Sequence, residues 1–149
     1  MKEAPVAPTP GYLVWRLANK WRVAVDRHVA PLGLTHAQYV LLASLYGMAL
    51  RGQRPSQREL ADHTGLEALY VSKLARALEA GCLIARTRDP QDTRTVRLAL
   101  TDHGRQTVRP AIAAVRVLLD RLLDPLGGGD DPRTAAFLHD LTVLLNAPL

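Results

Sequence analysis

The chain has 149 residues, of which 48% are hydrophobic and 22% charged, so we expect one folded domain with its own core. Aromatic residues make up only 5%, which favours helices packed through aliphatic side chains over a β-sandwich. The net charge is +5, and 16 of the 19 basic residues are arginine. Arginine suits phosphate and base-edge recognition. The codon bias of a GC-rich genome gives the same excess, so charge alone points only weakly to nucleic acid.

Several classes of protein are made improbable by what the sequence lacks. The single cysteine, Cys82, allows no intramolecular disulfide, and we expect it to be a buried apolar residue in a reducing compartment. The five histidines show no metal-ligand spacing and no catalytic motif is present, so we expect no metal, no cofactor and no enzyme. No apolar run approaches the ~20 residues that span a bilayer, and residues 1–10 lack the apolar stretch of a signal peptide. We therefore expect no membrane contact and a cytoplasmic location.

The first half of the chain predicts an arm followed by two helices. Three prolines make residues 1–10 a flexible arm, and apolar residues spaced by three or four predict a helix over residues 11–29. Thr35 and Gln38 form a capping box that opens a second helix, which runs to about Leu50.

A short helix, a tight turn and a longer helix come next. Ser56 and Glu59 form a second capping box, and Thr64-Gly65 breaks the helix that it opens. Residues 67–80 predict the longer helix, with Leu74 and Leu78 in the core and Gly81 at its C-terminal cap. This order is the helix-turn-helix arrangement.

A hairpin and two terminal helices complete the chain. Residues 82–86 and 96–100 predict two strands joined by a polar loop. A long helix over 102–123 contains Pro110, which should kink it or remove one hydrogen bond. After a glycine-rich break, Asp130 or Asp131 caps a last helix over about 131–146.

Charge and apolar surface are unevenly shared along the chain. Residues 51–109 hold 11 basic and 7 acidic side chains, whereas residues 110–149 hold 3 and 5. The positive charge therefore coincides with the helix-turn-helix and the hairpin. The first helix and the last two carry more apolar surface than one small domain can bury, so we predict that they interlock with a second copy of the chain.

An ordered set of short motifs runs from Leu34 to Gly104. The motifs are Leu34-Thr35 with Gln38, Glu59-Leu60-Ala61, Val71-Ser72-Lys73-Leu74, Leu78-Glu79-x-Gly81, Leu83-Ile84-x-Arg86, Asp89-Pro90-Gln91-Asp92-Thr93-Arg94 and Leu100-Thr101-x-x-Gly104. In this order they resemble the MarR family of winged-helix transcription factors. The resemblance implies a mainly α fold with a small β-hairpin wing and a homodimer that binds a palindromic double-stranded DNA operator. A repressor that a small aromatic or phenolic ligand releases is the expected function. Two departures stand out: Glu67-Ala68-Leu69-Tyr70 replaces small hydroxyl residues, and the first helix lacks a redox cysteine.

The helix over 67–80 and the wing supply the predicted DNA contacts. The buried positions of the helix leave its other side free for base edges and phosphates. On the wing, Arg94 matches the family's wing arginine and is the first candidate for the minor groove, while Asp92 either holds a nearby arginine or simply makes an Asx turn. The predicted DNA-binding residues are Ala68, Leu69, Tyr70, Ser72, Lys73, Arg76, Arg86, Arg88 and Arg94, with Asp92 as wing support.

A ligand site follows only from the resemblance, which places aromatic acids between the dimer helices and the DNA-binding lobe. Aromatic side chains could stack on a ring and an arginine could pair with a carboxylate; packing in the dimer core is the alternative role for each. The candidates are Tyr12, Trp15, Arg16, Asn19 and Tyr39.

The predicted organisation is an arm over 1–10 and a single domain over 11–149, with a DNA-binding lobe at about 35–101 and dimerisation helices at about 11–30 and 102–147. Two alternatives stay open: a winged-helix DNA-binding protein without a ligand, and a winged-helix module for protein–protein contact.

Overall fold

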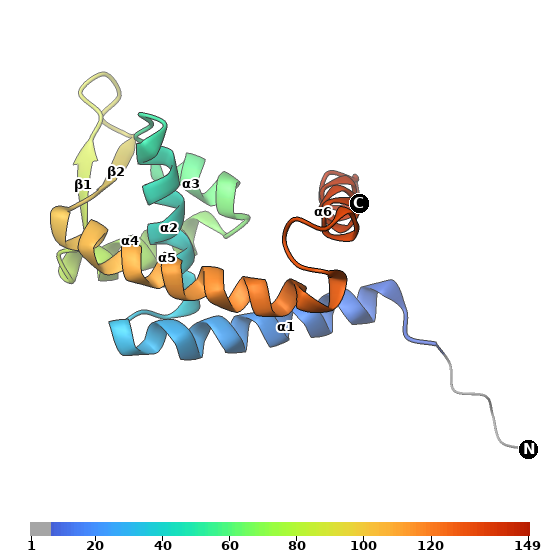
Figure 1. Cartoon of the computed structure of the whole chain (residues 1–149). Helices are drawn as coiled ribbons and strands as arrows, with labels where there is room; N and C mark the ends of the chain where they lie inside the picture. The colour runs from blue at the N-terminus through green and yellow to red at the C-terminus, as the bar shows by residue number, and fades with distance from the viewer. Residues whose placement is uncertain (1–6) are drawn as a thin grey trace, which may run out of the picture.

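A computed structural model describes residues 7–149, which form six α-helices and one two-stranded sheet (Figure 1). The predicted arm lies mostly outside the described residues; of its last part, residues 7–9 are neither helix nor strand. The elements are α1 (Pro10–Val29), α2 (His36–Leu50), α3 (Gln57–Thr64), α4 (Ala68–Ala80), β1 (Ile84–Arg88), β2 (Val96–Leu100), α5 (Asp102–Leu123) and α6 (Pro132–Leu145), with short 3-10 turns at Ala30–Leu32 and Asp124–Leu126. The mainly helical fold with a hairpin wing is confirmed.

The helix starts follow the capping residues of the sequence. The Thr35 hydroxyl accepts a hydrogen bond from the Gln38 N–H at 3.2 Å, and the Gln38 side chain accepts one from the Thr35 N–H at 3.1 Å. The box at Ser56 is only half formed, because its hydroxyl accepts from the Glu59 N–H at 3.0 Å while the Glu59 carboxylate turns to Arg97 at 3.5 Å. That diversion ties α3 to the wing.

One hydrophobic core joins α2, α3, α4 and the hairpin to α5 and the C-terminal end of α1. Leu60, Leu78 and Leu98 are fully buried in it. The two strands pair antiparallel, from Ile84 opposite Leu100 to Arg88 opposite Val96. This shared core holds α4 and the hairpin in place against α1, α2 and α5.

Gly104 lets α5 pack tightly against the start of the hairpin. A Cβ atom at this position would clash with the Leu83 carbonyl oxygen, and that same oxygen accepts a hydrogen bond from the Thr101 N–H at 3.1 Å. The glycine of the Leu-Thr-x-x-Gly motif is therefore needed for a close approach rather than for a turn.

Gly81 is the C-cap of α4, as predicted, but the residue after it differs from the prediction. Cys82 adopts the left-handed conformation, with φ of 58°, and it is exposed rather than buried. The reason is that the chain must reverse so that Ile84 enters the core, which turns Cys82 outward and delays the first strand from residue 82 to residue 84. Its carbonyl oxygen accepts a hydrogen bond from the Thr101 hydroxyl at 2.6 Å.

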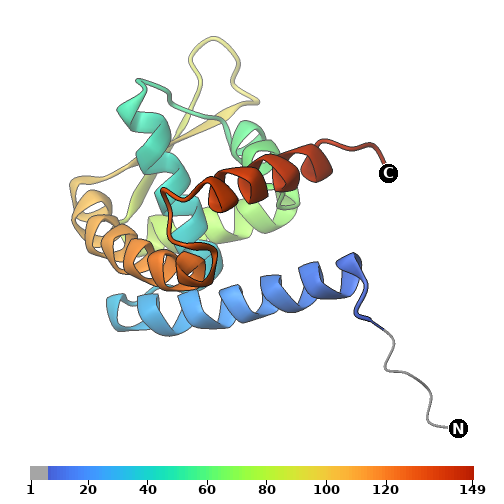
Figure 2. The same ribbon diagram turned by 45° about the vertical axis from the view of Figure 1, so that its right-hand side comes forward.

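The terminal helices are arranged differently from the lobe. α5 packs against α1 and continues through Pro110. After the Gly127–Gly129 linker, α6 stands away from the lobe in Figure 1, and in the turned view of Figure 2 it passes in front of the lobe. Asp131 caps α6, since its carboxylate accepts from the Arg133 N–H at 2.8 Å. Thr134 is the only buried residue of α6, and its hydroxyl donates to the Gly128 carbonyl at 2.6 Å. No helix among the described residues is long and apolar enough to cross a bilayer.

Candidate nucleic-acid interface

α4 has one face in the core and one in solvent. Val71, Leu74, Ala75 and Leu78 are buried. The opposite side carries side chains at helical spacings of three and four, so that they form a continuous stripe. Those stripe residues are Leu69, Ser72, Lys73 and Arg76, of which Ser72 is half-buried and the others are exposed. The structure therefore presents two cations and a hydroxyl on the outer side of the second helix of the helix-turn-helix.

The first turn of α4 is apolar. Glu67 occupies the N-cap position but its side chain makes no capping hydrogen bond. Ala68, Leu69 and Tyr70 follow and are exposed, with Leu69 84% accessible. The carboxylate of Glu67 suits the positive end of the helix dipole.

The wing tip is ordered by Asp92. Its carboxylate accepts hydrogen bonds from the Arg94 backbone N–H and the Thr95 hydroxyl, both at 3.1 Å, and lies 3.6 Å from the Arg94 guanidinium. Asp92 thus makes an Asx turn and an ion pair together, so the two roles left open for it coexist. The Arg94 side chain remains 94% exposed, which leaves it free to reach a ligand.

Two of the wing arginines that were predicted to contact DNA form hydrogen bonds within the protein. Arg86 is only 24% exposed and donates to Glu79 of α4 at 3.1 Å and to Gln57 of α3 at 3.4 Å. Arg88 donates to the Thr93 carbonyl at 2.7 Å across the hairpin tip. These interactions give Arg86 a bracing role between the strand and both helices, whereas Arg88 closes the wing loop.

Arg97 is the site residue that the sequence-based list omits. Its guanidinium donates to Asp89 at 2.8 Å and to the Arg54 carbonyl at 3.0 Å, and it pairs with Glu59 at 3.5 Å. Hydrogen bonding to Asp89 raises the pKa of Arg97. The pKa of Asp89 is held below its ordinary value, first by the Gln91 backbone N–H and then by Arg97. The alternation of charged and apolar residues along β2 was the available signal, because it puts Arg97 on the polar face.

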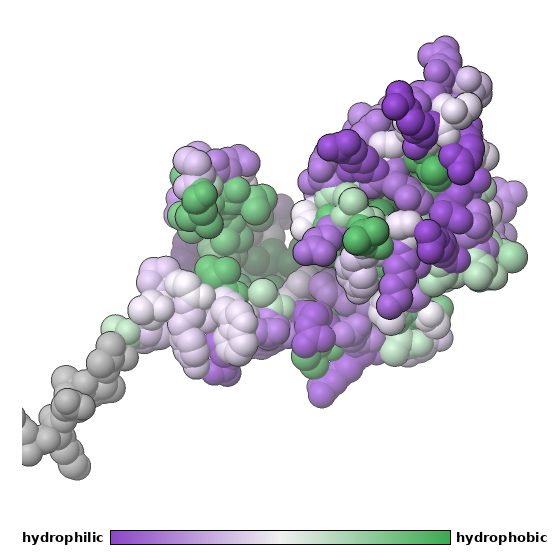
Figure 3. All heavy atoms as spheres, turned by 180° about the vertical axis from the view of Figure 1, so that it is seen from behind, coloured by the Kyte–Doolittle hydropathy of each residue, from purple (hydrophilic) through white to green (hydrophobic). Residues whose placement is uncertain are grey.

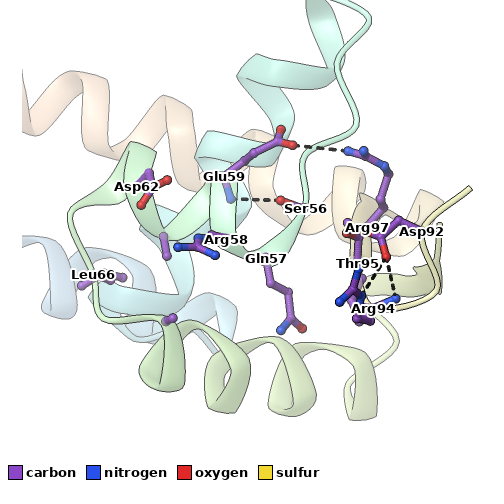
Figure 4. Close-up of a pocket in the computed structure, with 13 residues that line it drawn as sticks. Ser56, Gln57, Arg58, Glu59, Asp62, Leu66, Asp92, Arg94, Thr95 and Arg97 are labelled. Atoms are coloured by element: carbon purple, nitrogen blue, oxygen red, sulfur yellow. Dashed lines mark hydrogen bonds and ion pairs between the residues drawn. The ribbon is translucent and has the colours of Figure 1, made fainter.

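An open groove lies between α3, the start of α4 and the wing (Figure 4). Its volume is about 720 Å³, and Ala68, the first residue of α4, lines it. Its charged lining residues are Arg58, Glu59, Asp62, Asp92, Arg94 and Arg97. The helix-turn-helix and the wing therefore face a common space of mixed charge.

The five candidate ligand residues do not form one site in the single chain. Tyr12, Trp15, Arg16 and Asn19 share one face of α1, where the Arg16 guanidinium donates to the Tyr12 hydroxyl at 2.8 Å and the Asn19 amide donates to the Trp15 carbonyl at 3.0 Å. Tyr39 lies on α2, half-buried against the core, and burial raises the pKa of its phenol.

An apolar cavity of about 700 Å³ lies instead between α1, α5 and α6. Hydrophobic side chains from all three helices line it, and sequence reasoning named none of them as ligand contacts. They include Leu17, Trp21, Leu122, Phe137 and Leu141. The space-filling view shows the apolar side chains of α6 beside a hollow, while polar residues dominate the wing and the lobe (Figure 3).

A helix-turn-helix followed by a two-stranded wing, with long helices on either side, defines a winged-helix transcriptional regulator. The MarR family model matches residues 34–96. The chain is 36% identical over 107 residues to the uncharacterised HTH-type transcriptional regulator YdcH of Bacillus subtilis, covering 72% of this chain and 73% of YdcH. It belongs to the MarR family.

Solved structures agree with this assignment over nearly the whole chain. The repressor CouR bound to a 23-mer DNA duplex is 31% identical, with a TM-score of 0.79 and coverage of 97% of this chain and 98% of CouR. The PcaV regulator of Streptomyces coelicolor in complex with its natural ligand is 26% identical, with a TM-score of 0.78 and coverage of 97% and 96%.

Proposed function

We propose that the protein is a sequence-specific double-stranded DNA-binding repressor that acts as a homodimer on a palindromic operator. The observation that carries the proposal is the outer stripe of α4, where Lys73 and Arg76 are exposed beside Ser72. Arg94 on the wing tip adds a cation that stays 94% exposed beside Asp92, in reach of a second groove. In this proposal Ala68, Leu69 and Tyr70 also touch DNA. The structural neighbour CouR is a transcriptional repressor bound to a DNA duplex, which supports the same role here.

The dimer is supported by apolar surface that the single chain leaves open. Large hydrophobic side chains are exposed on the outer parts of α1 and along α6, where water would otherwise contact them. These exposed residues are Tyr12, Leu13, Val14, Trp15 and Leu17 on α1 and Leu138, Leu141, Val143, Leu144 and Leu145 on α6. Burying them against a second copy stabilises the pair by about 25 cal/mol per Å² of apolar surface, and sets two α4 helices to read sites ~34 Å apart.

The proposal keeps the predicted division of the chain: an arm over 1–10, a DNA-binding lobe at about 35–101 and dimerisation helices at about 11–30 and 102–147. A regulator of this kind acts on cytoplasmic DNA and carries no catalytic site. The charges fit this division, because the surplus of basic residues lies at 51–109.

A small aromatic effector is the second element of the proposal. In the single chain, the apolar cavity between α1, α5 and α6 is large enough for such a molecule. Leu17 and Leu141 line this cavity and also belong to the surface proposed to pair the two chains, so the effector would share these side chains with the dimer contact. PcaV is a structural neighbour solved with its natural ligand. Tyr12, Trp15, Arg16, Asn19 and Tyr39 stay predictions as ligand contacts. An effector that binds one dimer conformation better than the other would shift the spacing of the two α4 helices.

The experiment is selection from a random duplex pool, followed by titration of the selected sequence against a scrambled duplex at 50 to 200 mM salt. The expected result is an inverted repeat and an affinity that falls steeply with salt, since each displaced phosphate counterion adds about 0.9 to the slope. No selected sequence and a flat salt dependence would favour the protein–protein module. Adding phenolic acids to the complex then tests the effector.

A further inference from the structure

The first two residues of α4 offer no side-chain hydrogen-bond donor where base edges would lie. In a helix-turn-helix the N-terminal residues of the second helix contact the bases. Here Ala68 and Leu69 have aliphatic side chains, and Leu69 is 84% exposed. Bidentate hydrogen bonds of the kind that arginine, asparagine or glutamine make to purines are impossible from these two positions.

The position of Leu69, rather than its exposure alone, is informative, because single exposed leucines are common on protein surfaces. Leu50 at the end of α2 is 73% exposed without belonging to any charged stripe. Leu69 lies three, four and seven residues before Ser72, Lys73 and Arg76, and so shares their outward face. An aliphatic side chain thus leads a stripe whose other members are hydrogen-bond donors.

Contact with phosphate is disfavoured at this turn. A free helix N-terminus attracts phosphate through its N–H groups and its dipole. Glu67 at the N-cap places a carboxylate there and makes no capping bond that would neutralise it. The turn therefore suits the floor of the major groove better than the DNA backbone.

The major groove offers one apolar group on its base edges, the C5 methyl of thymine. We propose that Leu69 reads the C5 methyl group of a thymine in each half-site of the operator, with Ala68 beside it. The inference rests on the proposed DNA-binding function and adds the base that this turn selects. Lys73 and Arg76 would then supply donors to neighbouring bases or phosphates.

Deoxyuridine scanning tests the proposal, because dU pairs like thymine but lacks the methyl group. Each thymine of the selected inverted repeat is replaced in turn, and the affinity is measured by fluorescence anisotropy. At one thymine in each half-site, dU should weaken binding about four-fold, and roughly fifteen-fold when both half-sites carry it, from the transfer free energy of one buried carbon. Other thymines should tolerate the change.

Three variants make the result specific to Leu69. Leu69→Ala should bind the thymine and dU duplexes equally, whereas Leu69→Met, which keeps an aliphatic contact, should retain most of the difference. Leu50→Ala removes a similarly exposed leucine elsewhere and should behave like the wild-type chain. Since Leu69 is outside the core, circular dichroism should show all three folded.

A half-site without a dU-sensitive thymine would overturn the inference, and so would equal dU sensitivity in Leu69→Ala and wild type. Both results leave the proposed function intact, because the selected repeat is still bound. Failure to select any sequence would overturn the proposed function and the inference with it.

Discussion

The winged lobe and the terminal helices differ in how far they bury their large hydrophobic side chains. In the lobe, Leu60, Leu78 and Leu98 are fully buried and the surface is lined with charge. In α6 the buried residue is a threonine, while Leu138, Leu144 and Leu145 face solvent. The lobe buries its large hydrophobic side chains within one chain, in a core that it shares with α5 and the end of α1, and presents polar groups to a polar partner. The terminal helices are incomplete in one chain, and their apolar surface calls for a second copy.

The largest effect is expected from a charge placed on α6, where the single chain leaves leucines exposed. Leu141→Glu puts a carboxylate among the apolar residues of α6 that line the cavity with α1 and α5. Burying that charge unpaired disfavours association by several kcal/mol, so sedimentation velocity should show a monomer and operator affinity should fall by at least about 100-fold. Leu50→Glu, an equally drastic change on an exposed leucine of the lobe, should leave the mass unchanged. A dimer of normal stability in Leu141→Glu would contradict the assignment of α6.

A smaller effect is expected at the wing tip. Arg94→Ala removes a fully exposed cation from the proposed minor-groove contact. Operator affinity should fall by about ten-fold, and the slope of log affinity against log salt should drop by about one per protomer. Arg133→Ala, at the exposed start of α6, serves as the matched control and should keep the wild-type slope. An unchanged slope in Arg94→Ala would remove this residue from the contacts.

Arg97 should behave differently from Arg94, because its interactions lie within the protein. Arg97→Gln breaks its bonds to Asp89 and Glu59. Amide hydrogen exchange should accelerate over residues 89–95 while the core stays protected, and binding should weaken a few-fold with an unchanged salt slope. A loss of salt slope equal to that of Arg94→Ala would show that Arg97 contacts phosphate directly.

The smallest effect is a pH dependence of the wing. The pKa of Asp89 is lowered by the Gln91 N–H and by Arg97, so the folded state favours the ionised carboxylate. Its stabilisation is therefore complete above the ordinary aspartate pKa, near 4, and is lost as the pH falls through the lowered value. The difference in thermal midpoint between wild type and Asp89→Asn should be constant from pH 7 to 5 and shrink below about pH 4. A difference that stays constant down to pH 3 would contradict the linkage.

Local signals predicted most of the fold. Thr35 with Gln38, the Gly65 turn and the glycine-rich break before α6 act over a few residues, so the sequence locates the helix ends directly. The prediction that Cys82 is buried was wrong. The left-handed turn at this residue depends on Ile84 entering the core, which is a tertiary constraint.

The site was predictable where it depends on residues close together in the sequence, as in the outer face of α4 and the contact of Asp92 with Arg94. Helical spacing identifies the outer stripe of α4 from residues such as Lys73 and Arg76. The partners of Arg86 and Arg97 could not be predicted, because Gln57, Glu79 and Arg54 come from other elements and meet them only in the folded chain. The cavity between α1, α5 and α6 depends likewise on how three helices pack.

The central claim is that the lobe reads DNA only when the terminal helices pair two chains. Light scattering of the complex with the selected inverted repeat tests it most directly. The account predicts two 16.3 kDa chains per duplex, no smaller complex during the titration, and far weaker binding to an isolated half-site. One chain per duplex, with equal affinity for the half-site and the full repeat, would contradict it.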